Sequence, residues 1–237
     1  MSKLSSRIVS KIPRGEGFAD EALTNRRMAM VSEQIAGRGI RDSRLLQAMR
    51  EVPRHEFLPK SARDNAYEDR PLSIGEGQTI SQPYIVAAMI EPLDCGSNDH
   101  VLDVGTGSGY QAAILAQLVR SVVSIEYRPS LAARARKTLA RLGIPNVTVL
   151  DGDGSDGSPV FSPYDAIVVA AGAPEAPSDL ISQLSKRGKM VVPVGTTNLQ
   201  HLTFFRRSVQ GLSEEVKEDC VFVPLVGRQG WRHSGAK

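Results

Sequence analysis

The chain has 237 residues, of which 41% are hydrophobic and 23% are charged, and its formal net charge at pH 7 is +3. These values are typical of an ordinary globular protein that forms one domain. The net charge is too small and too dispersed to indicate a nucleic-acid partner. No apolar run approaches the roughly 18 residues of a membrane span, so we expect no membrane partner either.

The first residues of the chain are basic. Residues 1–20 are predicted to form a flexible tail, and the first fifteen carry Lys3, Arg7, Lys11 and Arg14 but no acidic residue. Organellar transit peptides share this composition, whereas the apolar core of a secretory signal is missing. We expect a cytoplasmic protein, with a transit peptide as the alternative.

A single domain is predicted over residues 21–230, and it begins with two helices within residues 21–60. Met28, Val31 and Ile35 are spaced for one face of a helix that ends at the following glycines. Asp42 or Ser43 is expected to cap a second helix, which Pro53 stops.

The stretch IGEGQTISQPYIVAAM, residues 74–89, changes abruptly from a polar, glycine-bearing segment to an apolar helical pattern. Thr and Ser side chains supply oxygen atoms to the unpaired amides at a helix start. The simplest expectation is therefore that Thr79 and Ser81 cap the helix.

Short strands rich in β-branched residues alternate with helices over residues 100–195. We expect strands at 100–104, 121–126, 147–150, 165–171 and 189–195, with helices over 109–118, 130–143 and 177–188. This alternation predicts right-handed βαβ units and a mainly parallel sheet with helices on both faces, as in Rossmann-like α/β proteins. Residues 200–230 instead predict consecutive antiparallel strands at a sheet edge.

The strongest local signal is VLDVGTGSGYQAA, residues 101–113, in which Gly105, Gly107 and Gly109 follow a strand and precede a helix. Glycines let a ligand lie against the backbone beyond the carboxyl ends of the strands. The third glycine comes one residue too early for a dinucleotide fingerprint, which disfavours an NAD oxidoreductase. Asp103 suits a cationic amino-acid group better than a pyrophosphate. A chance glycine-rich turn is the alternative.

Acidic residues also follow the next two strands. Glu126 ends the second strand, where an acid can accept hydrogen bonds from both ribose hydroxyls, although a solvated strand end is the simpler explanation for a lone Glu. In DGDG, residues 151–154, Asp153 can accept from an adenine amino group, or the sequence can be a tight turn. Three acids at successive strand ends agree with one nucleoside, and they predict an S-adenosylmethionine-dependent methyltransferase.

The chain resembles the protein-L-isoaspartate O-methyltransferase family. The resemblance rests on VPRHEFLP (52–59), GQTISQPYIVAAM (77–89), VLDVGTGSGYQAAILA (101–116), GDGSDG (152–157), PYDAIVVAAGAPEAPSDLISQL (163–184), GKMVVPVG (188–195) and FVPLV (222–226). It extends from about residue 26 to residue 230. Asp151 is an extra acid before the family's Gly-Asp-Gly pattern, and GRQGWRHSGAK at the C-terminus matches only loosely.

The resemblance implies methyl transfer from S-adenosyl-L-methionine, which leaves S-adenosyl-L-homocysteine, to isoaspartyl-containing proteins and peptides. It assigns the catalytic role to Ser81 and substrate binding to Thr79, Ile80 and Ser81. The motifs and the resemblance together predict these cofactor-binding residues: Gln78, Thr79, Ser81, Asp103, Gly105, Thr106, Gly107, Gly109, Glu126, Gly152, Asp153 and Gly154. No metal is expected.

The implied acceptor is the free α-carboxylate of an isoaspartyl residue, and its methyl ester recloses to a succinimide. A carboxylate is already ionised at neutral pH, so no general base is needed, and His55 is expected to be structural. The alternatives are another carboxyl or small-molecule methyltransferase and a nucleoside-sensing module without catalysis. A nucleic-acid amino-methyltransferase is disfavoured because SPYD (162–165) precedes the fourth strand. We expect a monomer, since no segment resembles an oligomerisation element.

Overall fold

The computed structural model describes residues 18–232 of the chain. Both predicted N-terminal helices are present, as α1 (Phe18–Ala29), which continues into a π-helical turn, and α2 (Ser43–Glu51). Asp42 caps α2, and its carboxylate accepts hydrogen bonds from the backbone N–H groups of Arg44 at 2.8 Å and Leu45 at 3.3 Å. Residues 18–20 of the predicted tail belong to α1, and the rest of that tail lies outside the described residues.

A small hairpin precedes helix α3 (Pro83–Ile90). Its strands β1 (Leu72–Gly75) and β2 (Gln78–Ile80) pair antiparallel. The expectation that Thr79 and Ser81 cap the helix is wrong, because β2 occupies that position and the N-cap is Gln82 without a side-chain hydrogen bond. Pro83 starts the helix instead, since its fixed φ suits the first helical turn.

Within the described residues, seven strands form the central sheet in the order β5-β4-β3-β6-β7-β8-β9. Their bounds are β3 (His100–Val104), β4 (Ser121–Glu126), β5 (Val147–Asp151), β6 (Tyr164–Val169), β7 (Leu184–Gly195), β8 (Gln200–Ser208) and β9 (Gly211–Cys220). Pairing is parallel from β5 to β7 and antiparallel at β8 and β9, which confirms the predicted fold class. The strand order reverses between β3 and β6, and ligands bind at such a point in open α/β sheets.

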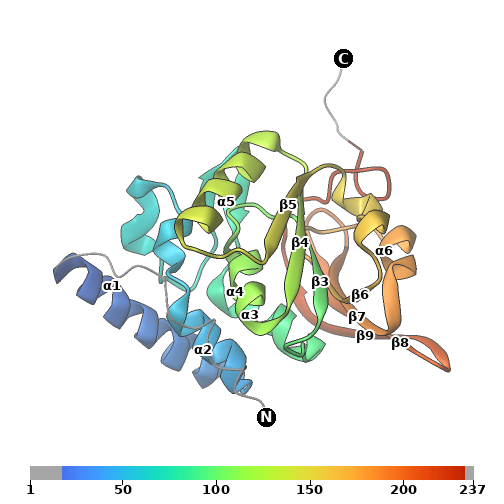
Figure 1. Ribbon diagram of the computed structural model, residues 1–237, viewed down its shortest axis with the longest axis horizontal. Helices are drawn as coiled ribbons and strands as arrows, with labels where there is room; N and C mark the ends of the chain where they lie inside the picture. Colours follow the sequence, from blue (N-terminus) through green and yellow to red (C-terminus); the bar gives the residue numbers. More distant parts are fainter. Residues whose placement is uncertain (1–17, 233–237) are drawn as a thin grey trace, which may run out of the picture.

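Helices cover both faces of the sheet (Figure 1). The remaining α-helices are α4 (Tyr110–Leu118), α5 (Pro129–Arg141) and α6 (Ser178–Ser182), and shorter helical turns lie at Met30–Ile35, Ala36–Arg38, Arg54–Phe57, Lys60–Asn65, Glu91–Leu93, Gly154–Asp156 and Pro159–Phe161. Helices α1 to α5 lie on one side of the sheet and α6 lies on the other. Consecutive residues of a strand point to opposite faces of the sheet and belong to separate hydrophobic cores. Val101 packs in the core beneath α2 to α5, and Leu102 packs in the core beneath α6.

Several element boundaries differ from the sequence prediction, and the largest difference is that β7 begins at Leu184 rather than at residue 189. Helix α6 ends at Ser182, well before residue 188, because the following residues already pair with β6 and Leu184 lies opposite Tyr164. Strand β9 begins at Gly211 and ends at Cys220, so the predicted run of antiparallel strands stops well before residue 230. The residues after β9 leave that edge and return to the middle of the sheet.

The segment that connects α2 to the hairpin packs on the start of α4 through buried polar side chains. Arg54 is fully buried, donates from Nε to the Ala66 carbonyl at 2.8 Å, and lies over the Tyr110 ring. Burial lowers the pKa of Arg54 to about 10. His55 contacts the Tyr67 hydroxyl through Nδ1 at 2.7 Å, which is the structural role expected of it.

A buried polar network lies beneath the loop that follows β3. Asp103 is inaccessible to solvent, and its two oxygens accept hydrogen bonds from Gln111 Nε2 at 2.8 Å and Ser124 Oγ at 2.6 Å. Ser124 Oγ also lies 2.5 Å from Thr106 Oγ1. Burial, with a smaller effect of Glu126, raises the pKa of Asp103 to about 6 even though the two hydrogen bonds oppose that shift. The network joins β3, β4, α4 and the loop.

The raised pKa of Asp103 predicts a specific dependence of stability on pH. The unfolded chain ionises this group near 3.8, whereas the folded chain keeps the proton until about 6, so its stabilising contribution is lost as the pH rises through that window. Between about pH 4.5 and about pH 7, the wild type should lose about 2 kcal/mol of unfolding free energy relative to Asp103→Asn. Urea denaturation at both values measures the difference. Parallel pH profiles for the two proteins would contradict it.

Candidate active site

A cleft lies at the carboxyl ends of the central strands, where the strand order reverses. Its empty volume is about 610 Å³, part of which is open to solvent. The cleft is lined by Gln78, Thr79, Val104, Gly105, Gly107, Ile125, Glu126, Tyr127, Arg128, Gly154, Ala170, Ala171, Val223, Pro224, Leu225 and Val226.

The loop after β3 forms the floor of the cleft and requires glycine. Gly105 and Gly107 adopt φ values of 89° and 54°, in the region that side chains disfavour. The backbone N–H of Gly105 donates to the Ile125 carbonyl at 2.9 Å, which ties the loop to β4. Gly109 does not line the cleft but is the N-cap of α4. The loop therefore presents backbone to any ligand.

Glu126 places a carboxylate beside this loop. Its Oε2 accepts from the Gly107 N–H at 2.7 Å, and its Oε1 accepts from the Arg128 N–H at 2.9 Å. The residue is only 6% exposed, so it is not the solvated strand end considered from sequence. Each carboxylate oxygen can accept more than one hydrogen bond. Glu126 thus retains acceptor capacity on the side that lines the cleft.

The hairpin forms a second wall because α5 holds it there. Arg134 Nη2 donates to the Ile74 carbonyl at 2.8 Å, and Ser130 Oγ donates to Glu76 Oε1 at 3.0 Å. These contacts bring Gln78 and Thr79 to the edge of the cleft.

The next two residues of the predicted substrate loop do not line the cleft. Ile80 is buried in the core, and Ser81 is half-buried at the start of the connection to α3. The Ser81 hydroxyl makes no hydrogen bond with any residue in the described part of the chain. It is therefore a free donor next to the wall.

Besides Ser81 and Gly109, four more predicted cofactor residues lie outside the cleft. Asp103 and Thr106 belong to the buried network under the loop, so the geometry does not support direct contact between the Asp103 carboxylate and a ligand. Gly152 and Asp153 also lie outside it, whereas Gly154 lines it. A Cβ on Gly154 would lie 2.5 Å from Val104 Cγ1, which explains the glycine. The Asp153 carboxylate caps the turn that follows β5.

Several lining residues were not predicted from sequence. Tyr127 and Arg128 follow Glu126 directly, while Ala170 and Ala171 follow β6. Residues 223–226 form a third wall, which is joined to the sheet by the hydrogen bonds Gly172 N to Val223 O and Leu225 N to Gly172 O, both 2.8 Å. FVPLV is one of the segments that carry the family resemblance, but its sequence does not indicate that it returns to the cleft.

The charge in the cleft suits binding of a polar ligand rather than proton transfer. Among the lining residues, Glu126 and Arg128 carry charge, and both are tied to neighbours, since Arg128 Nη1 lies 3.9 Å from Glu76 Oε2. His55 lies outside the cleft, and no group of three possible metal ligands occurs in the described residues. The site therefore offers a backbone cradle, one carboxylate acceptor and neighbouring hydroxyls.

Comparison with known proteins gives matches over almost the whole domain. Residues 25–230 match the family described as protein-L-isoaspartate(D-aspartate) O-methyltransferase (PCMT). Protein-L-isoaspartate O-methyltransferase from Methanoculleus marisnigri is 54% identical over 207 residues, which cover 87% of this chain and 94% of that protein. Protein-L-isoaspartate O-methyltransferase 1 from Rhodopseudomonas palustris is 53% identical over 209 residues, 86% of this chain and 84% of that protein.

Solved structures agree in fold. One protein-L-isoaspartate O-methyltransferase superposes with a TM-score of 0.77 at 31% identity, covering 87% of this chain and 67% of the other. A Plasmodium falciparum chain that carries the same family name, solved with S-adenosyl-L-homocysteine, gives a TM-score of 0.75 at 24% identity over 84% and 98% of the two chains. The chain belongs to the protein-L-isoaspartate(D-aspartate) O-methyltransferase family.

Proposed function

We propose that Ser81 and the hairpin bind the isoaspartyl carboxylate while the glycine loop and Glu126 hold the methyl donor. As a family member, the chain is an S-adenosylmethionine-dependent protein carboxyl O-methyltransferase that acts on L-isoaspartyl residues of damaged proteins. The reaction starts repair, because the methyl ester recloses to a succinimide. The observation that carries the assignment of roles is the meeting of Gln78 and Thr79 with Glu126 in one cleft.

The cleft fits a nucleoside ligand in three respects. The loop at Gly105 and Gly107 presents bare backbone, and a Cβ at Gly107 would also meet Ile74 Cδ1 at 3.4 Å. Glu126 offers carboxylate oxygens suited to ribose hydroxyls. Gly154 leaves room for a base at the end of β5. When bound, S-adenosylmethionine supplies an electrophilic methyl group.

The hairpin and the adjoining Ser81 can position a carboxylate acceptor and shield it from water. A carboxylate with a pKa of roughly 3 to 4 is ionised at neutral pH, so placement and desolvation replace a general base. The free Ser81 hydroxyl can donate a hydrogen bond to one carboxylate oxygen and leave the other to react. Thr79, on the preceding strand, lines the cleft and would close over the ligands, whereas the buried Ile80 anchors that strand in the core.

Asp103 and Thr106 support the site from below. Because both are bonded to Ser124, they fix the glycine loop against β4 rather than touch a ligand. Gly109 starts α4 and orients the far side of the loop. We keep Gly152 and Asp153 as neighbours of the base region, with Asp153 acting through its turn.

We further propose a cytoplasmic monomer that binds neither nucleic acid nor membranes. The small, dispersed net charge of +3 supports the absence of nucleic-acid binding. None of the helices in the described part of the chain is long and apolar enough to cross a bilayer.

Methyl transfer to a matched pair of peptides tests the function. The peptides differ only in whether one aspartyl linkage is normal or isoaspartyl, and the donor carries a labelled methyl group. We expect label only on the isoaspartyl peptide, as a base-labile ester that releases methanol in alkali. Label on neither peptide despite donor binding would favour the alternative methyltransferase.

Replacing the Ser81 hydroxyl should slow turnover on the isoaspartyl peptide. Loss of one hydrogen bond to a charged group, roughly 1.5–3 kcal/mol, predicts a 10- to 100-fold lower kcat for Ser81→Ala. Affinity for S-adenosylhomocysteine should stay unchanged in calorimetry. Ser97→Ala, on an exposed turn, is the matched control. Wild-type kcat in Ser81→Ala would remove this residue from the mechanism.

Glu126→Gln should weaken cofactor binding. The amide keeps the size of the side chain but replaces one acceptor with a donor that opposes a backbone N–H. We expect the Kd for S-adenosylhomocysteine to rise by roughly 10- to 100-fold, as for lost hydrogen bonds to a charged acceptor. Isothermal titration measures it, with exposed Glu175→Gln as the control. An unchanged Kd would exclude ribose recognition by Glu126.

A further inference from the structure

A compact turn, residues 227–231, follows the C-terminal wall of the cleft. Its backbone closes on itself through hydrogen bonds from Gly230 N to Gly227 O at 3.2 Å and from Trp231 N to Leu225 O at 2.7 Å. A Cβ on Gly227 would lie 2.0 Å from Asp153 Oδ1, and one on Gly230 would lie 2.1 Å from Leu225 O. Both glycines are therefore required by close contacts.

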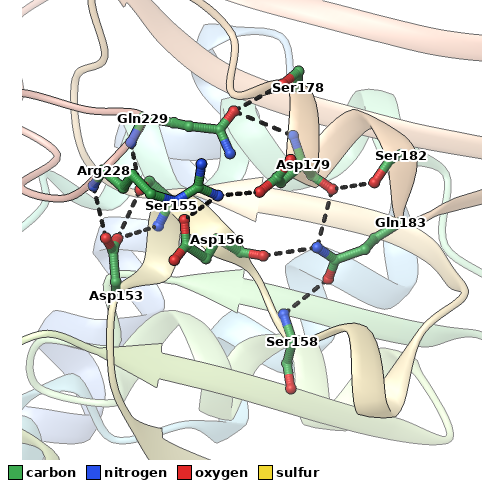
Figure 2. Close-up of polar contacts among 10 residues, drawn as sticks. All are labelled: Asp153, Ser155, Asp156, Ser158, Ser178, Asp179, Ser182, Gln183, Arg228 and Gln229. Atoms are coloured by element: carbon green, nitrogen blue, oxygen red, sulfur yellow. Dashed lines mark hydrogen bonds and ion pairs between the residues drawn. The ribbon is translucent and has the colours of Figure 1, made fainter.

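The backbone of this C-terminal turn is bound by the turn that follows β5 (Figure 2). Arg228 N donates to Asp153 Oδ2 at 2.7 Å, and Gln229 N donates to Ser155 Oγ at 3.0 Å. Asp153 Oδ1 in turn accepts from Ser155 N at 2.9 Å and Ser155 Oγ at 2.7 Å. The carboxylate predicted from sequence to read a base thus holds the C-terminal turn.

The side chains of the C-terminal turn reach a second element, α6. Arg228 forms ion pairs with Asp156, at 2.8 Å, and with Asp179. Gln229 Oε1 accepts from Ser178 Oγ at 2.9 Å. Figure 2 shows these contacts converging from three segments that are far apart in the sequence.

The turn that follows β5 and helix α6, which both contact the C-terminal turn, are also joined to each other. Gln183 Nε2 donates to the Asp156 carbonyl at 2.8 Å and to the Asp179 carbonyl at 3.0 Å, while Gln183 Oε1 accepts from Ser158 N at 2.8 Å. The C-terminal turn is therefore fastened to a connected frame. Exposed ion pairs contribute little alone, so Arg228 acts together with the backbone hydrogen bonds to Asp153 and Ser155.

We propose that the C-terminal turn is a latch that positions residues 223–226 against Gly154, and that Arg228 is its positioning residue for cofactor binding. The wall and Gly154 line the same cleft, and the latch begins one residue after Val226. Loosening it lets this end of the cleft open and take up water. The inference rests on the proposed function only for the identity of the ligand.

Two variants that each remove one positive charge test the latch. Arg228→Gln removes both ion pairs, whereas Arg232→Gln removes one positive charge from an exposed neighbour outside the latch. In titration calorimetry, we expect Arg228→Gln to raise the Kd for S-adenosylhomocysteine by roughly 3- to 10-fold and Arg232→Gln to leave it unchanged. Gly227→Ala, which forces Asp153 away, should raise it at least as much.

The only tryptophan of the chain provides a readout independent of activity. Trp231 donates from Nε1 to the Gly172 carbonyl at 3.1 Å, so its fluorescence reports whether the turn stays seated. We expect Arg228→Gln to shift emission to longer wavelength and increase acrylamide quenching, with an unchanged urea midpoint.

Two results would overturn the latch: wild-type Kd in both Arg228→Gln and Gly227→Ala, or equal losses of affinity in Arg228→Gln and Arg232→Gln. Binding of S-adenosylhomocysteine without methyl transfer to isoaspartyl peptides would instead count against the proposed function and leave the latch standing.

Discussion

The hydrogen bond from the Gly107 N–H to Glu126 Oε2, at 2.7 Å, joins the ends of two parallel strands and forms the base of the cleft. A carboxylate that is 6% exposed needs such donors, because an ionised group loses much solvation when it leaves water. The glycine supplies its amide without a side chain that would fill the space above. One contact therefore holds the loop, orients the carboxylate and leaves room for a ligand.

Around this base, the walls come from segments that are distant in sequence. The hairpin is held by Arg134 and Ser130 of α5, and residues 223–226 are held by Gly172 and the C-terminal turn. Apolar packing supports these polar contacts, since Ile80 of the hairpin and Leu225 of the C-terminal wall are buried.

Acidic residues near the cleft have different roles according to their surroundings. Glu126 faces the cleft with spare acceptor capacity, whereas Asp103 is sealed beneath the loop and has a pKa raised to about 6 by burial. Asp153 accepts a hydrogen bond from one backbone donor of the C-terminal turn, the Arg228 N–H. The chemistry fits this division, because methylation of an ionised carboxylate asks for placement and a dry surface rather than for a protonatable base.

Local periodicity and glycine spacing encode strand ends and the turns between them, so the parallel α/β fold, the glycine loop and the carboxylate at Glu126 could be predicted from the amino-acid sequence. The family-specific segment around Ser81 could also be read directly. Which acids reach the cleft became clear from the folded arrangement, since a shift of one strand position turns a side chain to the opposite face of the sheet. Asp103 was therefore predicted as a contact but lies in the core. The return of residues 223–226 to the cleft, and the binding of Arg228 to Asp156 and Asp179, depend on long-range hydrogen bonds and ion pairs that no local pattern indicates.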